Sequence, residues 1–221
     1  MPVRRRAVLV VALGASSALT VALGATDPAG ITDYPTRFLA WNLVLAWMPL
    51  AAALGFTRSR QWWSRLGCGV AWLLFLPNAP YLVTDLVHLR GNENELWRHI
   101  LEFGFAAWTG MLLGVVSLRI VHVDIERRHN ARTGWLLVAL ATGLCAIGVV
   151  IGRFQRWNSW DLVIRPRAVA ASTFDWVRAP VSNVRDTGVA MAVAAFFGIA
   201  YLTIWALDGL GASTRSATGR D

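Results

Sequence analysis

Six apolar runs of about 20 residues constrain this chain more than any other feature of its sequence. They cover residues 7–26, 38–57, 66–84, 99–121, 134–152 and 188–207. A helix needs roughly 20 mostly apolar residues to cross the hydrocarbon core of a bilayer. With 56% hydrophobic and 15% charged residues, a water-soluble fold could not bury so much apolar surface. We therefore predict a single all-α domain, a polytopic bundle of about six transmembrane helices.

Arginine supplies all the basic side chains, because none of the 21 Lys and Arg residues is Lys. A net charge of +8 raises nucleic acid or an anionic membrane surface as partners. The arginines lie in short loops beside the spans, as membrane topology requires, so we expect no nucleic-acid partner. Counting alternate loops places twelve arginines on the side of the termini and nine on the other. This bias predicts that both termini are cytoplasmic.

Two further segments bear on the topology. The first span resembles a signal peptide, with the basic start MPVRRR and the small-residue end ALGA. Its apolar region exceeds the usual 7–15 residues, so we favour a retained anchor; cleavage would leave five spans. The outer connection at residues 153–187 includes a mixed apolar and charged stretch that fits a short interfacial helix.

The third span ends in an unusual segment, LFLPNAPYLVTDLVHLRGNE, at residues 74–93. On a continuous helix its polar residues form one stripe, made of Asn78, Tyr81, Asp85, His88 and Asn92. Such a stripe turns away from lipid. Asp85 and His88 are candidate catalytic residues, because ionisable groups near membrane depth are costly and tend to be functional. Asp85 could orient His88 for proton transfer.

Two prolines are expected to kink this third helix. Pro77 and Pro80 would each remove a backbone hydrogen bond. The carbonyls freed near Leu73 and Leu76 then need donors at membrane depth, and Asn78 has donors within reach. In the simplest interpretation the polar residues here only satisfy the kink and hold helices together; in the alternative they bind a ligand.

A second polar cluster, GRFQRWNSWDL, follows the fifth span at residues 152–162. Under the predicted topology it emerges on the outer side, together with the polar end of the third span and the RFLAWN start of the second. Convergence of separated polar segments on one face indicates a site. The candidate ligand-binding residues are Asn42, Asn78, Tyr81, Arg153, Arg156, Asn158 and Asp161. In the alternative interpretation, the arginines snorkel and the tryptophans form an interfacial belt.

Small residues predict where helices approach closely. Gly110 and Gly114, and Gly148 and Gly152, have the four-residue spacing that permits such contacts within the membrane. The basic loop after the fourth span, which includes His122, is expected to be a topological signal and a solvated face.

Three motifs carry a family resemblance: RFLAWNLVLAWMPL, WLLFLPNAPYLVTDLVHL and IGRFQRWNSWDL. In this order and spacing they resemble the bacterial membrane family catalogued as domain of unknown function 1361, over about residues 37–165. The resemblance implies a multi-pass protein of the bacterial cell membrane, and the family carries no assigned activity or catalytic residues. The matching positions are Trp41, Asn42, Pro77, Asn78, Pro80, Tyr81, Asp85, His88, Arg153, Arg156, Trp157, Asn158, Trp160 and Asp161.

Three functions fit these residues. The first is an assembly or interaction protein whose partner is another membrane protein. The second is an enzyme at the outer leaflet, with Asp85 and His88 as acid and base and Arg153 and Arg156 holding an anionic lipid headgroup. The third is a small transporter lined by the broken third span. No nucleophile motif or metal-ligand spacing is present, so we expect neither a metal nor a cofactor.

Overall fold

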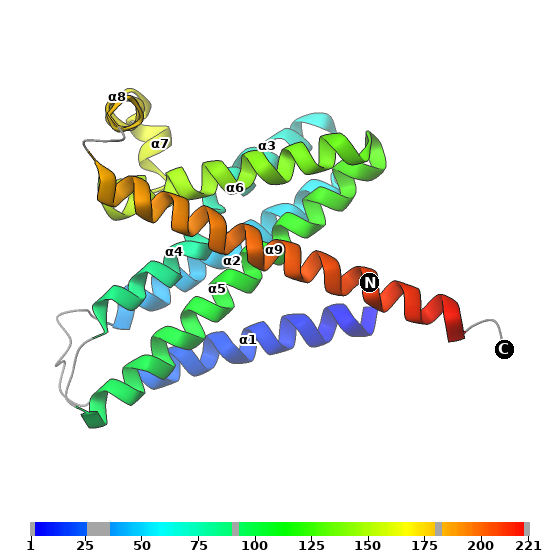
Figure 1. The fold of residues 1–221 in the computed structure, drawn as a ribbon, viewed down its shortest axis with the longest axis horizontal. Helices are drawn as coiled ribbons and strands as arrows, with labels where there is room; N and C mark the ends of the chain where they lie inside the picture. The colour runs from blue at the N-terminus through cyan, green and yellow to red at the C-terminus, as the bar shows by residue number, and fades with distance from the viewer. Residues whose placement is uncertain (1–2, 26–35, 90–92, 180–182, 219–221) are drawn as a thin grey trace.

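The computed structural model describes residues 3–25, 36–89, 93–179 and 183–218. These residues form helices and their connections, with no strand among them (Figure 1). The elements are α1 Val3–Ala25, α2 Thr36–Arg58, α3 Trp62–Phe75, α4 Asn78–Thr84, the 3₁₀ helix η1 Asp85–His88, α5 Glu93–Arg128, α6 Ala131–Arg153, α7 Asp161–Ile164, α8 Pro166–Arg178 and α9 Val184–Thr218. The predicted all-α bundle is confirmed.

Six segments of the described chain are long and apolar enough to cross a membrane. They are Ala7–Ala25, Phe38–Arg58, Trp62–His88, Leu96–Arg128, Ala131–Arg153 and Val184–Gly209. Each corresponds to one of the six predicted runs. The fourth extends furthest beyond its prediction, because the charged residues at its ends interrupt the apolar run without ending the helix.

Helix α5 is the centre of the bundle. It packs against α1, α2, α4, α6 and α9, and Leu113, Val115 and Leu118 on it are fully buried. A hydrogen bond from Thr109 Oγ1 to Ser16 Oγ, at 2.6 Å, ties α5 to α1. Hydroxyl pairs of this kind satisfy polar groups where lipid offers no partner.

The third span is broken rather than gently kinked. Helix α3 ends at Phe75, residues 76–77 form a turn, and α4 begins at Asn78. Pro77 accounts for the break because it has no amide hydrogen. Pro80 does not interrupt α4, since it is the third helical residue, where an amide has no partner within the helix in any case.

The carbonyl that Asn78 satisfies differs from the predicted ones. Its Nδ2 donates to the oxygen of Phe75 at 3.0 Å, whereas Leu76 O accepts from the amide of Ala79 at 3.1 Å. The tighter bond from Ala79 to Leu76 leaves Phe75 O, its usual helical acceptor, without a backbone donor. The side chain of Asn78 fills that gap.

The polar stripe does not follow one continuous α-helix. From Asp85 the chain tightens into η1, and after His88 the backbone of Leu89 is extended (φ −60°, ψ 111°). In a 3₁₀ helix residues three apart lie directly above one another, so Asp85 and His88 still share a face. Asn92, the last member of the predicted stripe, lies outside the described residues.

Both glycine pairs contact α4 or the turn before it, as the small-residue spacing predicted. A Cβ on Gly110 would lie 2.5 Å from Ala79 O, and one on Gly114 would lie 2.8 Å from Ala79 Cβ. On the other side, a Cβ on Gly148 would lie 2.4 Å from Pro77 Cγ. Helices α5 and α6 can therefore pack closely against the broken part of the third span, because the residues that face it are glycines.

The connection after α6 contains the short helix α7 and the longer helix α8. Figure 1 shows both at the end of the bundle where α6 ends and α9 begins. Val169 of α8 is buried, whereas Phe174 and Val177 are exposed. A helix is thus present within this connection; its place in the membrane interface stays a prediction.

Candidate functional site

The guanidinium of Arg153 joins the third span to the end of α6. Its Nη1 donates to Asp85 Oδ1 at 2.8 Å and to the hydroxyl of Tyr81 at 3.4 Å. Its Nη2 donates to the carbonyl oxygen of Thr84 at 3.1 Å and lies 2.6 Å from His88 Nε2. The N–H groups of both terminal nitrogens thus point at partners on one stretch of chain. We call these five residues the Arg153 cluster.

The ion pair at the centre of the cluster is almost closed to solvent. The side chain of Asp85 is 1% exposed and that of Arg153 is 12% exposed, so the two charges compensate each other away from water. Asn42 of α2 donates from Nδ2 to Asp85 Oδ2 at 3.4 Å. Because an arginine nitrogen can only donate, Nε2 of His88 is the acceptor in its contact with Arg153.

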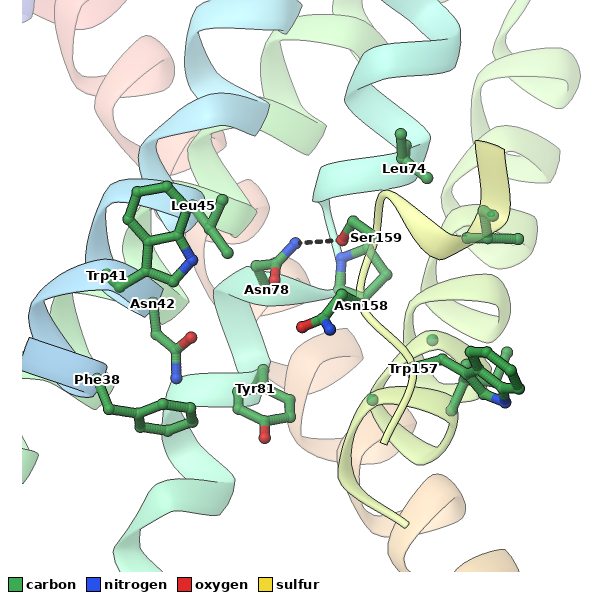
Figure 2. A pocket seen from close by; sticks show the side chains of 15 residues that line it. Phe38, Trp41, Asn42, Leu45, Leu74, Asn78, Tyr81, Trp157, Asn158 and Ser159 are labelled. Atoms are coloured by element: carbon green, nitrogen blue, oxygen red, sulfur yellow. Dashed lines mark hydrogen bonds between the residues drawn. The ribbon is translucent and has the colours of Figure 1, made fainter. Parts of the chain in front are cut away.

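A pocket of about 120 Å³ lies beside this cluster. It opens where α2, the α3–α4 break, the end of α6 and the turn after α6 meet. The lining residues are Phe38, Trp41, Asn42, Leu45, Leu74, Pro77, Asn78, Tyr81, Gly148, Ile151, Gly152, Trp157, Asn158, Ser159 and Leu162. Figure 2 shows the side chains of Asn42, Asn78 and Asn158 around the same space, with Asn78 Nδ2 donating to Ser159 Oγ at 3.1 Å.

The turn after α6 brings its residues to the pocket by an unusual backbone conformation. Arg156 has a φ of 58°, in the left-handed region that favours glycine. The chain reverses there, and the amide of Trp157 returns to Ile151 O at 3.2 Å. Asp161 then accepts from the amide of Asn158 at 2.7 Å, which fixes the next part of the turn.

Helix α8 holds this turn from the outside. Ser172 Oγ accepts from Trp157 Nε1 at 3.1 Å and lies 2.9 Å from Gln155 Oε1. Gln155 Nε2 in turn donates to Ser172 O at 3.3 Å. Ser172 thus fixes both the indole ring of Trp157 and the side-chain amide of Gln155, in the turn that borders the pocket.

The predicted site residues fall into three groups. Asn42, Asn78, Tyr81 and Asn158 line the pocket. Asp85, His88 and Arg153 lie outside the lining, and Arg153 contacts both of the others. Asn42 and Tyr81, which line the pocket, also bond to Asp85 and Arg153 respectively. Arg156 is exposed and does not line the pocket, and Asp161 acts on the backbone of Asn158 rather than on the pocket.

Sequence reasoning did not find Ser159 and Ser172, which have no pattern of their own. It also placed His122 on a solvated face, and this was wrong. The side chain of His122 is fully buried and its Nδ1 hydrogen-bonds the hydroxyl of Tyr201, with the ring of Trp135 at 5.0 Å. The helical period could have shown His122 on the same side of α5 as the buried Leu118.

Within the described residues no group of three His, Cys, Asp or Glu side chains could hold a metal ion. The polar groups that meet at the pocket are amides and hydroxyls, which bind by hydrogen bonds. Asp85 and Arg153, the charged groups bonded to residues of the lining, are paired with each other. The arrangement therefore suits recognition of a polar group better than metal-assisted chemistry by this chain's own side chains.

Six apolar spans of the described chain, with α5 at their centre, indicate the class of multi-pass helical membrane proteins. Residues 41–204 match the family described as "Protein of unknown function (DUF1361)". This match covers most of the chain and includes the Arg153 cluster and every residue of the pocket lining except Phe38, so the protein belongs to that family. Comparison with curated proteins and with solved structures gave no match.

Proposed function

We propose that this protein is a membrane-embedded binding protein, and that its pocket holds the polar head of an amphipathic molecule dissolved in the bilayer. The observation that carries the proposal is the pocket's mixed lining near the ends of the spans. Amides and hydroxyls from three segments face it, together with the apolar side chains of Leu45, Leu74 and Ile151. An amphipathic ligand matches such a lining.

The depth of the pocket supports this proposal. Phe38 begins the second span, and Gly152 lies one residue before the end of the fifth. Leu45 lies seven residues beyond Phe38, which is about 10 Å along a helix that rises 1.5 Å per residue. Leu74 and Pro77 lie deeper, near the middle of the third span. The pocket therefore extends from the end of the spans toward the middle of a hydrocarbon core about 30 Å thick, as a polar head joined to an apolar chain requires.

The bonding of the charged residues favours binding over catalysis by Asp85 and His88. Asp85 is buried against Arg153, and His88 Nε2 is the atom that Arg153 approaches. A general base needs its proton-accepting atom within reach of the substrate. In our proposal these residues fix the position of Tyr81 instead, which shares its hydroxyl with the cluster and lines the pocket.

Transport is less well supported by the sequence. No charged residue lies between 66 and 84 or between 134 and 152, so the inner parts of the third and fifth spans offer no charged groups for a path. Transporter sites are typically found near the bilayer midplane. The charged cluster here lies instead at one end of the spans.

We further propose that the protein lies in a bacterial cell membrane with both termini in the cytoplasm. The pocket would then face the outer leaflet. The arginine bias of the loops, twelve against nine, supports this orientation. The family resemblance supports the bacterial origin.

Retention of lipid by the purified protein tests the binding function. The protein, isolated in mild detergent, is expected to keep a bound amphipath that native mass spectrometry detects. Leu45→Trp fills the pocket and should release it. Val44→Trp is the matched control, because Val44 is the neighbouring residue on α2, is 53% exposed and does not line the pocket.

Equal retention by both variants would contradict the proposal. If the unmodified protein retained no amphipath at all, a protein partner would become the better explanation of this surface.

A further inference from the structure

We infer that the headgroup bound in this pocket is uncharged and rich in hydroxyl groups, such as a single sugar ring or a glycerol unit. This inference rests on the proposed binding function and adds the chemical class of the ligand. It depends on the polar atoms that line the pocket, on the paired state of Arg153 beside it and on the size of the pocket.

The polar side chains that line the pocket are all neutral. They are the amides of Asn42, Asn78 and Asn158 and the hydroxyls of Tyr81 and Ser159. Amides and hydroxyls both donate and accept hydrogen bonds. A sugar or glycerol hydroxyl does the same, so each hydroxyl of such a ligand can both donate to and accept from these side chains. A phosphate at neutral pH mainly accepts, and binding it favours cationic donors.

Arg153, the cation bonded to the lining residue Tyr81, is not free to hold an anion. Arg153 is bonded to Asp85, to Thr84 O, to Tyr81 and to His88. An anionic headgroup would have to displace Asp85 from Arg153. It would also meet the negative charge of that carboxylate, which is 1% exposed and cannot turn to water. A neutral headgroup can bond to Asn42 or Tyr81 without breaking the pair.

Two tryptophans at the pocket add an aromatic surface. Trp41 is 52% exposed, and the ring of Trp157 is held in place through its bond to Ser172. The negative face of an indole attracts weakly positive C–H groups, which the face of a sugar ring presents. Tryptophan is common at membrane interfaces, so the amides carry the inference and the tryptophans add to it.

The size of the pocket restricts the ligand further. Its volume of about 120 Å³ is well below the roughly 300–1,000 Å³ of pockets that enclose a whole drug-sized molecule. One ring or one glycerol unit fits, whereas a large oligosaccharide does not. The apolar side of the pocket, at Leu45 and Leu74, then receives the first part of the ligand's apolar chain.

A lipid competition experiment tests this inference. The protein is placed in phosphatidylcholine nanodiscs that contain equal amounts of monoglucosyl diacylglycerol and phosphatidic acid, and native mass spectrometry identifies the lipids that remain bound on release. We expect enrichment of the glucosyl lipid over both phospholipids. Asn158→Ala should lower that enrichment about threefold to tenfold, the effect of losing one or two neutral hydrogen bonds.

Gln61→Ala is the matched control. It also removes an amide, but Gln61 is exposed, lies before α3 and does not line the pocket. It should leave the enrichment unchanged, and an equal loss in both variants would overturn the inference.

The other outcomes separate the two proposals. Enrichment of phosphatidic acid, or retention of lipid without preference, would overturn the neutral headgroup and leave the binding function in place. Retention of no lipid by the unmodified protein would overturn both.

Discussion

At the scale of single residues, Arg153 does most to define the candidate site. It lies 68 residues from Asp85 in the chain and 65 from His88, yet bonds to both. Removing one member of a buried ion pair leaves the other charge without compensation, which costs far more than the pair contributes. The carboxylate of Asp85 is therefore a stability determinant as well as a site residue.

We predict that Asp85→Asn lowers the free energy of unfolding by about 3 kcal/mol. Arg153 would remain buried without a counter-charge. Loss of helical circular dichroism on heating or on titration with a denaturing detergent measures the change. Asp208→Asn is the control. Asp208 pairs with Arg119 at 3.1 Å, and the side chains of Arg119 and Asp208 are 22% and 36% exposed. Pairs open to solvent contribute less than about 1 kcal/mol. Similar losses in both variants would contradict a dominant role for the buried pair.

At the scale of elements, the broken third span depends on its neighbours. Helix α4 has only seven residues, too few to be stable by itself. Gly110 and Gly114 of α5 and Gly148 of α6 let those helices approach it closely. The position of Asn78 and Tyr81 at the pocket therefore follows from packing against α5 and α6.

We predict that Gly148→Ala destabilises the protein and displaces the α3–α4 turn. The new methyl group would meet Pro77 Cγ at 2.4 Å, and Pro77 is a rigid ring that cannot move aside. Gly143→Ala, on the same helix, meets nothing within 4 Å. It should stabilise the helix by about 0.5–1 kcal/mol, because alanine replaces glycine in a helix interior. We expect a lower unfolding temperature for Gly148→Ala and a higher one for Gly143→Ala. A change of the same sign in both variants would contradict the prediction.

The elements also show what sequence alone can predict. Hydropathy predicted all six spans, because bilayer crossing imposes one length and one composition. Pro77 predicted the interruption of the third span. The identity of the carbonyl bonded by Asn78 was not predictable, because it depends on the bond between Ala79 and Leu76 within the turn.

Contacts between distant segments were beyond the sequence as well. The convergence of the second, third and fifth spans was expected from topology, but Arg153 was assigned to an anion and is paired with Asp85 instead. Ser172 bonds to Trp157, which lies 15 residues away in the chain, and His122 bonds to Tyr201, which lies 79 residues away. No local period encodes such pairs, so only the packed structure shows them.

At the scale of the whole molecule, orientation decides which leaflet the pocket faces. The Arg153 cluster and helices α7 and α8 lie at one end of the spans, and the pocket extends inward from that end. The end of α5, with exposed Arg127 and Arg128, lies at the other. The two ends can therefore be distinguished by accessibility in intact cells.

We predict that a cysteine at Arg165 reacts with a membrane-impermeant thiol reagent from outside intact cells, whereas one at Arg127 does not. Both positions are exposed, so a difference reports sidedness rather than burial. The background replaces Cys68 and Cys145 by alanine, since both are free thiols. Labelling at Arg127 alone would reverse the proposed topology and place the pocket at the inner leaflet.

The pairing of Asp85 with Arg153 also sets an order of events during biosynthesis. The ribosome makes Asp85 68 residues before its partner. At about 5–20 residues per second, that interval lasts about 3–14 seconds. During this time the carboxylate of Asp85 lacks its counter-charge, so we expect the end of the third span to take its final buried position only after the fifth span arrives. This expectation couples the two spans across an intervening helix.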